Sequence, residues 1–288
     1  MEKESHIHKV PDNLLKFKQN YCDDVAKWLL ELSVVSYIDD IKELENQIAT
    51  KTNFKVKKVC EKDNIEALVL YTDDVIVVSF AGTEVTEFSD INTDLQFWYS
   101  KAEGVRMHSG FYTAYKKIKF DVYRAVLELQ KDKHRDVYWT GHSLGGALAV
   151  IFGTFWKEKS VIYTYGQPRV GDRDFAKRTQ ARADHYRVTV NADFAPKAPP
   201  KWIIGYHHSG EETRLVIEPE FISFGWITNW IRKEVITFII AVFFRLSWFL
   251  TSFAWYARKA WIHHSMLTHR KLLWNPEQQR RHLPSETD

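Results

Sequence analysis

The chain has 288 residues, of which 45% are hydrophobic, 15% aromatic and 27% charged. A chain of this length and composition can bury one large hydrophobic core. The 40 basic and 37 acidic residues give a formal net charge of +3, an excess too small for the basic surface of a nucleic-acid-binding protein. We therefore expect a globular protein with no nucleic acid partner.

The redox compartment is indicated by the two cysteines, Cys22 and Cys60. A secreted scaffold held by disulfides would contain more, so we expect two free thiols in a reducing compartment, with one bridge between them as the alternative. The first six residues lack the apolar core of a secretory signal peptide. Both observations predict a cytoplasmic protein.

The first part of the chain, residues 1–60, is expected to form an N-terminal helical region. Apolar residues recur in it at the three-to-four spacing of a helix, and no proline follows Pro11 within the first 50 residues. These apolar residues are Leu14, Phe17, Tyr21, Val25, Trp28, Leu29 and Leu32. We interpret the region as a helical cap on the main domain.

The central part of the chain alternates strand-like apolar runs with helix-like segments. The predicted strands cover residues 67–71, 74–80, 136–140, 161–165 and 185–190, and the predicted helices cover 110–131 and 144–156. Unbroken apolar runs such as Val75-Ile76-Val77-Val78 are typical of strands buried on both faces. The alternation predicts an α/β fold with a mostly parallel sheet covered by helices, and we assign residues 1–288 to a single domain.

A hydrophobic, aromatic-rich helical insertion is predicted over residues 221–261. Between Val235 and Ala257 the only charged residue is Arg245, and the run is dense in Phe, Trp, Ile and Leu. The run is long enough to suggest a membrane-spanning helix.

The motif G-x-S-x-G occurs at Gly141-His142-Ser143-Leu144-Gly145. A strand-like run precedes it and a helix rich in Ala and Leu follows, which is the context of a nucleophile elbow. Glycines let the strand and the helix pass closely, and the first N–H groups of the helix point to the place where an oxyanion forms. The motif predicts Ser143 as a nucleophile; the alternative is a packing turn with an idle serine.

A nucleophilic serine requires a histidine base, and the base requires a carboxylate to orient it. In this fold class the acid follows the nucleophile in the chain, and the candidates are Asp172, Asp174, Asp184 and Asp193. Asp193 comes after the predicted strand 185–190, so it lies at a carboxyl edge where active sites gather. Three prolines, Pro196, Pro199 and Pro200, stiffen the loop behind it. Asp193 is therefore the predicted acid.

Six histidines follow Asp193 and could serve as the base. They are His207, His208, His263, His264, His269 and His282. Their positions in the chain do not choose among them.

Six further segments of the chain resemble motifs of one and the same protein family. They are Ser79-Phe80-Ala81-Gly82-Thr83, Asp90-Ile91-Asn92-Thr93-Asp94-Leu95, Met107-His108-Ser109-Gly110-Phe111, Thr164-Tyr165-Gly166-Gln167-Pro168-Arg169-Val170-Gly171, Asn191-Ala192-Asp193-Phe194-Ala195-Pro196 and Tyr206-His207-His208-Ser209-Gly210. With a last histidine motif near residue 264, this combination resembles the fungal-lipase-like family, the class-three lipases. The resemblance implies an α/β-hydrolase fold and a Ser-Asp-His triad.

The resemblance also implies roles for individual residues. It gives His264 as the catalytic base, whereas His208 belongs to a strand without a catalytic role. The oxyanion-hole donors are the backbone N–H groups of Thr83 and Leu144, and residues 84–90 occupy the position of the lid.

Two positions depart from the pattern of that family. His263 stands where an acidic residue usually precedes the base, so His263 is the neighbouring alternative to His264. Ala81 stands where an arginine is common, so the outer support of the oxyanion hole differs.

The triad restricts what the hydrophobic insertion can do. Asp193 and His264 must meet, and a single span between them would put them on opposite sides of a bilayer. On a helical projection most large apolar residues of 235–253 share one face, and cations flank the run at Arg232, Lys233, Arg258 and Lys259. We expect an in-plane or re-entrant membrane anchor, with a helix pair packed on the core or in a dimer contact as the alternative.

Taken together, the motif and the resemblance predict a lipase or phospholipase that cleaves fatty-acyl esters through an acyl-enzyme. The expected partners are a lipid ester and a membrane surface, and no metal or organic cofactor is implied. Two alternatives remain, a soluble carboxylesterase for short acyl chains and a catalytically idle protein that binds membranes.

Overall fold

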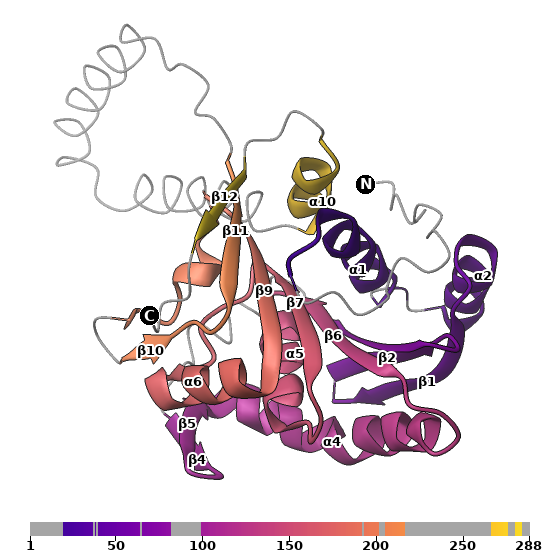
Figure 1. Cartoon of the computed structure of the whole chain (residues 1–288), viewed down its shortest axis with the longest axis horizontal. Helices are drawn as coiled ribbons and strands as arrows, with labels where there is room; N and C mark the ends of the chain where they lie inside the picture. The colour runs from indigo at the N-terminus through magenta and orange to yellow at the C-terminus, as the bar shows by residue number, and fades with distance from the viewer. Residues whose placement is uncertain are drawn as a thin grey trace, which may run out of the picture.

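The computed structural model describes residues 20–36, 38, 40–63, 65–81, 99–191, 193–201, 205–216, 266–275 and 280–283. Its main element is an eight-stranded sheet in the order β1-β2-β3-β6-β7-β9-β11-β12 (Figure 1). These strands are β1 (Lys55–Lys62), β2 (Ile65–Tyr71), β3 (Val75–Phe80), β6 (Asp136–His142), β7 (Ser160–Tyr165), β9 (Ala183–Val190), β11 (Glu211–Leu215) and β12 (Arg280–Leu283).

The sheet is mostly parallel, as the apolar strand runs predict. Strand β3 pairs with β6, β6 with β7, β7 with β9 and β9 with β11, all in parallel. The antiparallel pairs lie at the two ends of the sheet, where β1 pairs with β2, β2 with β3, and β11 with β12. Because β3, β6, β7, β9 and β11 run parallel to one another, their carboxyl ends meet at one edge of the sheet.

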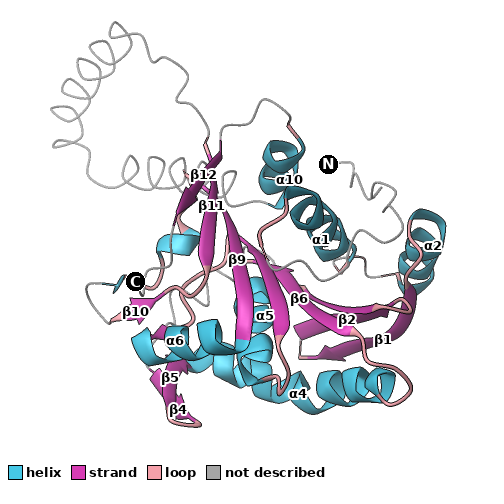
Figure 2. Ribbon diagram, viewed as in Figure 1, coloured by secondary structure: helices cyan, strands magenta, loops and turns pink. Residues whose placement is uncertain are grey.

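Helices cover both faces of this sheet (Figure 2). One face carries α4 (Ser109–Gln130), α5 (Leu144–Phe155) and α6 (Arg173–Arg182), and the other carries α1 (Asp23–Val35), α2 (Ile41–Lys51) and α10 (Met266–Trp274). Strand β3 serves both cores, because Ile76 and Val78 point to the first face and Val75 and Val77 to the second. A small second sheet, β10-β8-β5-β4, contains β4 (Tyr99–Ala102), β5 (Val105–His108), β8 (Gly171–Asp172) and β10 (Tyr206–His207).

The assignment of residues 1–60 to a helical region is wrong in its last part, because residues 55–62 form strand β1. This strand lies at the end of the sheet, is rich in lysine, and contains a register shift between Val56 and Lys58. Its apolar residues therefore keep no regular period that the sequence could show.

The helix α1 is an integral layer of the core and not an outer cap. Its residues Ala26, Leu29 and Leu30 are fully buried. The Tyr165 hydroxyl on β7 donates a hydrogen bond to the carbonyl of Ala26, and the hydroxyls of Ser33 and Thr140 lie 3.1 Å apart. Helix α1 is thus fastened to the strands that carry the nucleophile motif and its neighbour.

Both cysteines are free thiols, as predicted. Cys22 directly precedes α1, and Cys60 is buried in β1. Burial raises the pKa of the Cys60 thiol, which therefore stays protonated and unreactive.

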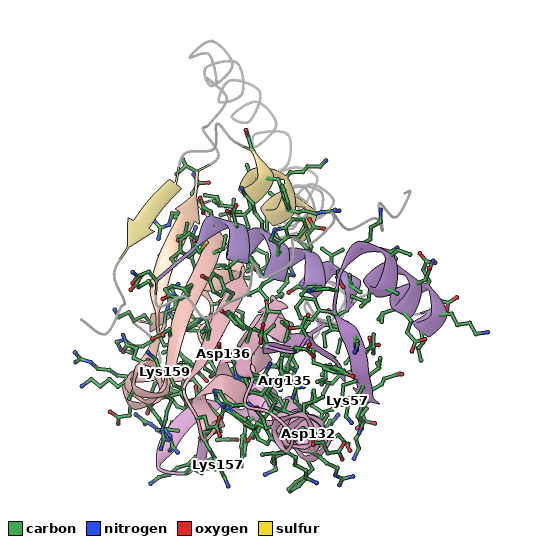
Figure 3. The ribbon with its side chains drawn as sticks, turned by 45° about the vertical axis from the view of Figure 1, so that its right-hand side comes forward. Lys57, Asp132, Arg135, Asp136, Lys157 and Lys159 are labelled. Atoms are coloured by element: carbon green, nitrogen blue, oxygen red, sulfur yellow. The ribbon has the colours of Figure 1, made fainter. Side chains whose placement is uncertain are left out.

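Charged side chains surround the amino ends of the parallel strands. Figure 3 shows Arg135, Asp136 and Lys159 there, in the half of the view away from α10. Lys159 pairs with Asp184 at 3.0 Å, and the Arg135 guanidinium donates to the carbonyl of Thr72 at 2.9 Å. These contacts hold the loops at the amino ends of the strands. An active site of this fold lies at the carboxyl ends, which form the opposite edge of the sheet.

The insertion 221–261 lies outside the described residues. None of the helices that the structure describes is both long and apolar enough to cross a membrane.

Candidate active site

Ser143 occupies a sharp turn between β6 and α5. Its backbone has φ 56° and ψ −122°, a left-handed conformation that residues with a Cβ rarely adopt. The Ser143 N–H donates to the carbonyl of Tyr165 on β7 at 3.0 Å, and its own carbonyl accepts from the Ala147 N–H at 3.2 Å. The strained turn is therefore held from both sides, which is the geometry of a nucleophile elbow.

Two glycines of the motif make this turn possible. A Cβ on Gly141 would lie 2.4 Å from the carbonyl carbon of Gly145, and a Cβ on Gly145 would lie 2.1 Å from the carbonyl oxygen of Phe80. Any side chain at either position would collide with backbone. Gly145 also packs the elbow against the backbone of Phe80 and Ala81 at the end of β3.

The oxyanion-hole candidates are described in part. Leu144 is the first residue of α5 and is buried, and the first N–H groups of a helix have no partner within the helix. The Leu144 N–H is thus available in the place where the resemblance expects a donor. Thr83 and the lid position 84–90 lie outside the described residues.

Asp193 lies just beyond the carboxyl end of β9 and its side chain is fully buried. The Asp193 N–H donates to the carbonyl of Val190, and the Ala195 N–H donates to Oδ1 of Asp193, both at 2.9 Å. Arg169, from the segment 164–171 that carries part of the resemblance, braces the same loop by donating to the carbonyls of Lys197 and Pro199. The carboxylate is therefore held in one orientation.

The other acid candidates are committed elsewhere. Asp172 begins α6 by accepting a hydrogen bond from the Phe175 N–H, and it also binds the Arg106 side chain at 2.8 Å. Asp174 is exposed in the first turn of α6, and Asp184 lies within β9 near its start. Among the four, Asp193 alone combines burial with a place at the carboxyl edge.

His208 supports the acid loop. Its Nε2–H donates to the carbonyl of Pro196 at 2.7 Å, and the ring is buried. Burial lowers the pKa of His208 well below its usual value, and the nearby Arg187 and Arg169 act in the same direction. A neutral ring that donates to a loop carbonyl has a structural role.

His269 is the histidine that the described part of the chain brings to Asp193. It lies on α10 and is fully buried, with its Nε2 3.7 Å from Oδ2 of Asp193. Its ring also lies edge-on to that of His142, with centroids 5.4 Å apart. His263 and His264 lie outside the described residues.

One feature of the sequence is consistent with a buried His269. Leu273 follows it at the i+4 spacing of one helix face, and both residues are fully buried. The predicted hydrophobic insertion ends at residue 261, only a few residues before α10 begins at Met266, so the sequence does not show α10 as a separate helix.

The fold and the residues at the carboxyl edge of the sheet together define a class of protein. A mostly parallel sheet between two helical layers, with a serine elbow after a central strand and a buried acid after a later strand, is the α/β-hydrolase architecture. The architecture alone does not define a function, since one fold carries many functions.

Comparisons with known proteins narrow the class. Residues 77–202 match the sequence profile of the family described as Lipase (class 3). A lipase of Rhizomucor miehei is 36% identical over 124 residues, which cover 40% of this chain and 34% of that protein. A triacylglycerol lipase of Arabidopsis thaliana is 25% identical over 274 residues, which cover 74% of this chain and 50% of that protein.

A solved structure agrees with this comparison. The native propeptide complex of Rhizomucor miehei lipase matches with a TM-score of 0.60 at 26% identity, over 67% of this chain and 68% of that one. Over residues 77–202 the chain is similar to the class 3, fungal-lipase-like α/β-hydrolases. It spans between about a third and a half of the length of the two curated relatives named above.

Proposed function

We propose that the protein is a lipase-like serine hydrolase that cleaves fatty-acyl esters, with Ser143, Asp193 and His264 as its triad. The observation that carries the proposal is the strained backbone of Ser143 at the start of α5. A fold holds such a conformation only where the surrounding contacts enforce it, and exposing a nucleophile is the use known for this turn. The two curated relatives named above are both called lipases, which supports the same chemistry.

The proposed reaction is an acyl transfer in two steps. His264, oriented by Asp193, takes the proton of Ser143 as its oxygen attacks the ester carbonyl, and then gives that proton to the leaving alcohol. The N–H groups of Thr83 and Leu144 stabilise the oxyanion. The same histidine then deprotonates a water that attacks the acyl-enzyme, and it returns the proton to the oxygen of Ser143 as the fatty acid leaves.

A panel of esters tests the substrate class. We expect the purified protein to hydrolyse long-chain glycerides or phospholipids faster than short-chain esters, and to gain activity when vesicles supply a lipid–water interface. The measurement is fatty acid released from each substrate, with and without vesicles. A preference for short esters with no gain at an interface would indicate a soluble carboxylesterase instead. No hydrolysis and no labelling of Ser143 by a fluorophosphonate would indicate an idle protein.

We also propose that the protein is cytoplasmic and binds membranes peripherally through residues 235–257. The support is the sequence pattern, an apolar stripe at helical spacing with cations and tryptophans near its ends. Asp in place of both Phe243 and Phe249 should release the protein from sedimenting vesicles. Each buried Phe contributes roughly 1.5–3 kcal/mol, so the double change should lower partitioning by several orders of magnitude.

The matched control places Asp at Thr237 and Thr251, on the polar side of the same projection, and should leave vesicle binding largely intact. Hydrolysis of a soluble short-chain ester should survive in both variants, because neither touches the triad. If the Phe243 and Phe249 variant unfolds or loses that activity, the segment belongs to the core or to a dimer contact. Binding that responds only to ionic strength would assign the attachment to the flanking cations.

A further inference from the structure

We propose that His269 is a positioning residue, a second histidine that holds the carboxylate of Asp193 in the orientation that the catalytic base needs. The inference rests on the proposed function, in which Asp193 is the acid of the triad. It assigns a task to a residue that the sequence left among six undistinguished candidates.

The two oxygens of Asp193 have different neighbours. Oδ1 accepts a hydrogen bond from the Ala195 N–H at 2.9 Å, whereas Oδ2 lies 3.7 Å from Nε2 of His269. The Asp193 and His269 side chains are both fully buried. A carboxylate without water is costly unless polar partners surround it, and electrostatic contacts act strongly in such a site. The imidazole thus stabilises the side of the carboxylate that Ala195 does not reach.

The same imidazole also contacts the elbow. The His269 and His142 rings meet edge-on with centroids 5.4 Å apart, and His142 directly precedes the nucleophile. His269 therefore lies between the acid and the residue next to Ser143. A side chain in this place fixes the relative position of the two loops that carry the acid and the nucleophile.

Helix α10 is fixed so that His269 faces inward. The neighbouring Arg270 donates through Nε to Oε1 of Glu31 on α1 at 2.7 Å, and the Glu31 side chain is fully buried. At the end of α10, Trp274 meets Trp28 of α1 edge-on at 5.2 Å between centroids. Consecutive helical residues point about 100° apart, so an Arg270 held by α1 sets the direction of His269.

The packing of α10 on α1 also affects the proposed base, His264. His264 precedes the first residue of α10, Met266, by two positions. The proposed base is therefore followed almost directly in the sequence by α10, the helix that Glu31 and Trp28 contact. A misplacement of only about 1 Å can cost on the order of a hundredfold in rate, so a helix held this firmly matters for catalysis.

The test compares two substitutions of His269. His269→Phe keeps the ring volume and removes the polar partner of Asp193, and it should lower kcat by about 10- to 100-fold with little change in KM. His269→Gln supplies a side-chain N–H near the position of Nε2 and should restore most of the lost kcat. The rate at which a fluorophosphonate labels Ser143 should fall and recover in parallel, because it reports activation of the nucleophile. Lys271→Gln, on the exposed side of α10, is the matched control and should change neither rate.

Three outcomes would overturn the inference. Equal kcat in His269→Phe and the wild type would show that Asp193 needs no such partner. Equal losses in the Phe and Gln variants, with thermal melting unchanged, would show that the side-chain N–H is not what matters. A His269→Phe variant as inactive as Ser143→Ala, beside an active His264→Ala, would make His269 the base itself. Failure of the proposed function looks different, because the wild type itself would then neither hydrolyse esters nor react with the fluorophosphonate.

Discussion

Ser143→Ala is expected to lower ester hydrolysis by a factor of about a thousand or more while the protein remains folded. The substitution removes only the hydroxyl, and alanine can occupy the same strained backbone because both residues carry a Cβ. The activity that remains should be the small background supplied by binding and the oxyanion hole. Hydrolysis of a chromogenic ester, with circular dichroism to check the fold, measures both parts of the expectation.

Contamination by a host esterase is the main source of error in this experiment. Labelling with a fluorophosphonate controls for it, because the wild type should carry one adduct on Ser143 and the variant none. A purified, folded Ser143→Ala protein that keeps more than about a thousandth of the wild-type rate would remove Ser143 from the mechanism.

His264→Ala is expected to reduce hydrolysis to the level of Ser143→Ala. The members of a triad act as a unit, so losing the base costs about as much as losing the nucleophile. The matched control is His208→Gln, which leaves the base in place and keeps a side-chain donor for the carbonyl of Pro196. Initial rates on one soluble ester, measured at equal concentrations of folded protein, compare the variants.

The reverse result would reassign the base. If His208→Gln were inactive and His264→Ala active, the loop support of His208 would be incidental and the resemblance misleading at this position. An intermediate rate in His208→Gln with a lower melting temperature would instead reflect loosening of the acid loop.

The central fold was predictable because its signals are local. Strands β3, β6 and β7 each contain three or four consecutive apolar residues and α5 is an apolar helix, so each element is visible within its own few residues. Strand β1 was not predictable, because an end strand with four lysines and an irregular register gives no apolar period. The burial of α1 was underestimated for a related reason, since a helical period does not say what the apolar face packs against.

The nucleophile and the acid of the candidate site could be predicted from local sequence in the same way. The elbow around Ser143 is a local motif, and Asp193 follows from its place after a strand. The histidine side of the site depends on contacts between distant parts of the chain. The position of His269 is set through Arg270, whose partner Glu31 lies 239 residues earlier, and no local pattern encodes such a pair. For that reason, the structure adds most to the sequence at α10.

The ion pair between Glu31 and Arg270 also has a consequence during synthesis. Helix α1 leaves the ribosome early, yet its buried glutamate gains this partner only after nearly the whole hydrolase fold has been translated. Until then a charged group sits within an apolar stripe, and the emerging sheet lacks the helix that completes one of its faces. Contacts between such distant segments form slowly, because a long loop must close first. The nascent chain therefore passes through a stage in which the strand that carries Ser143 can be formed but the histidine side of the site is absent.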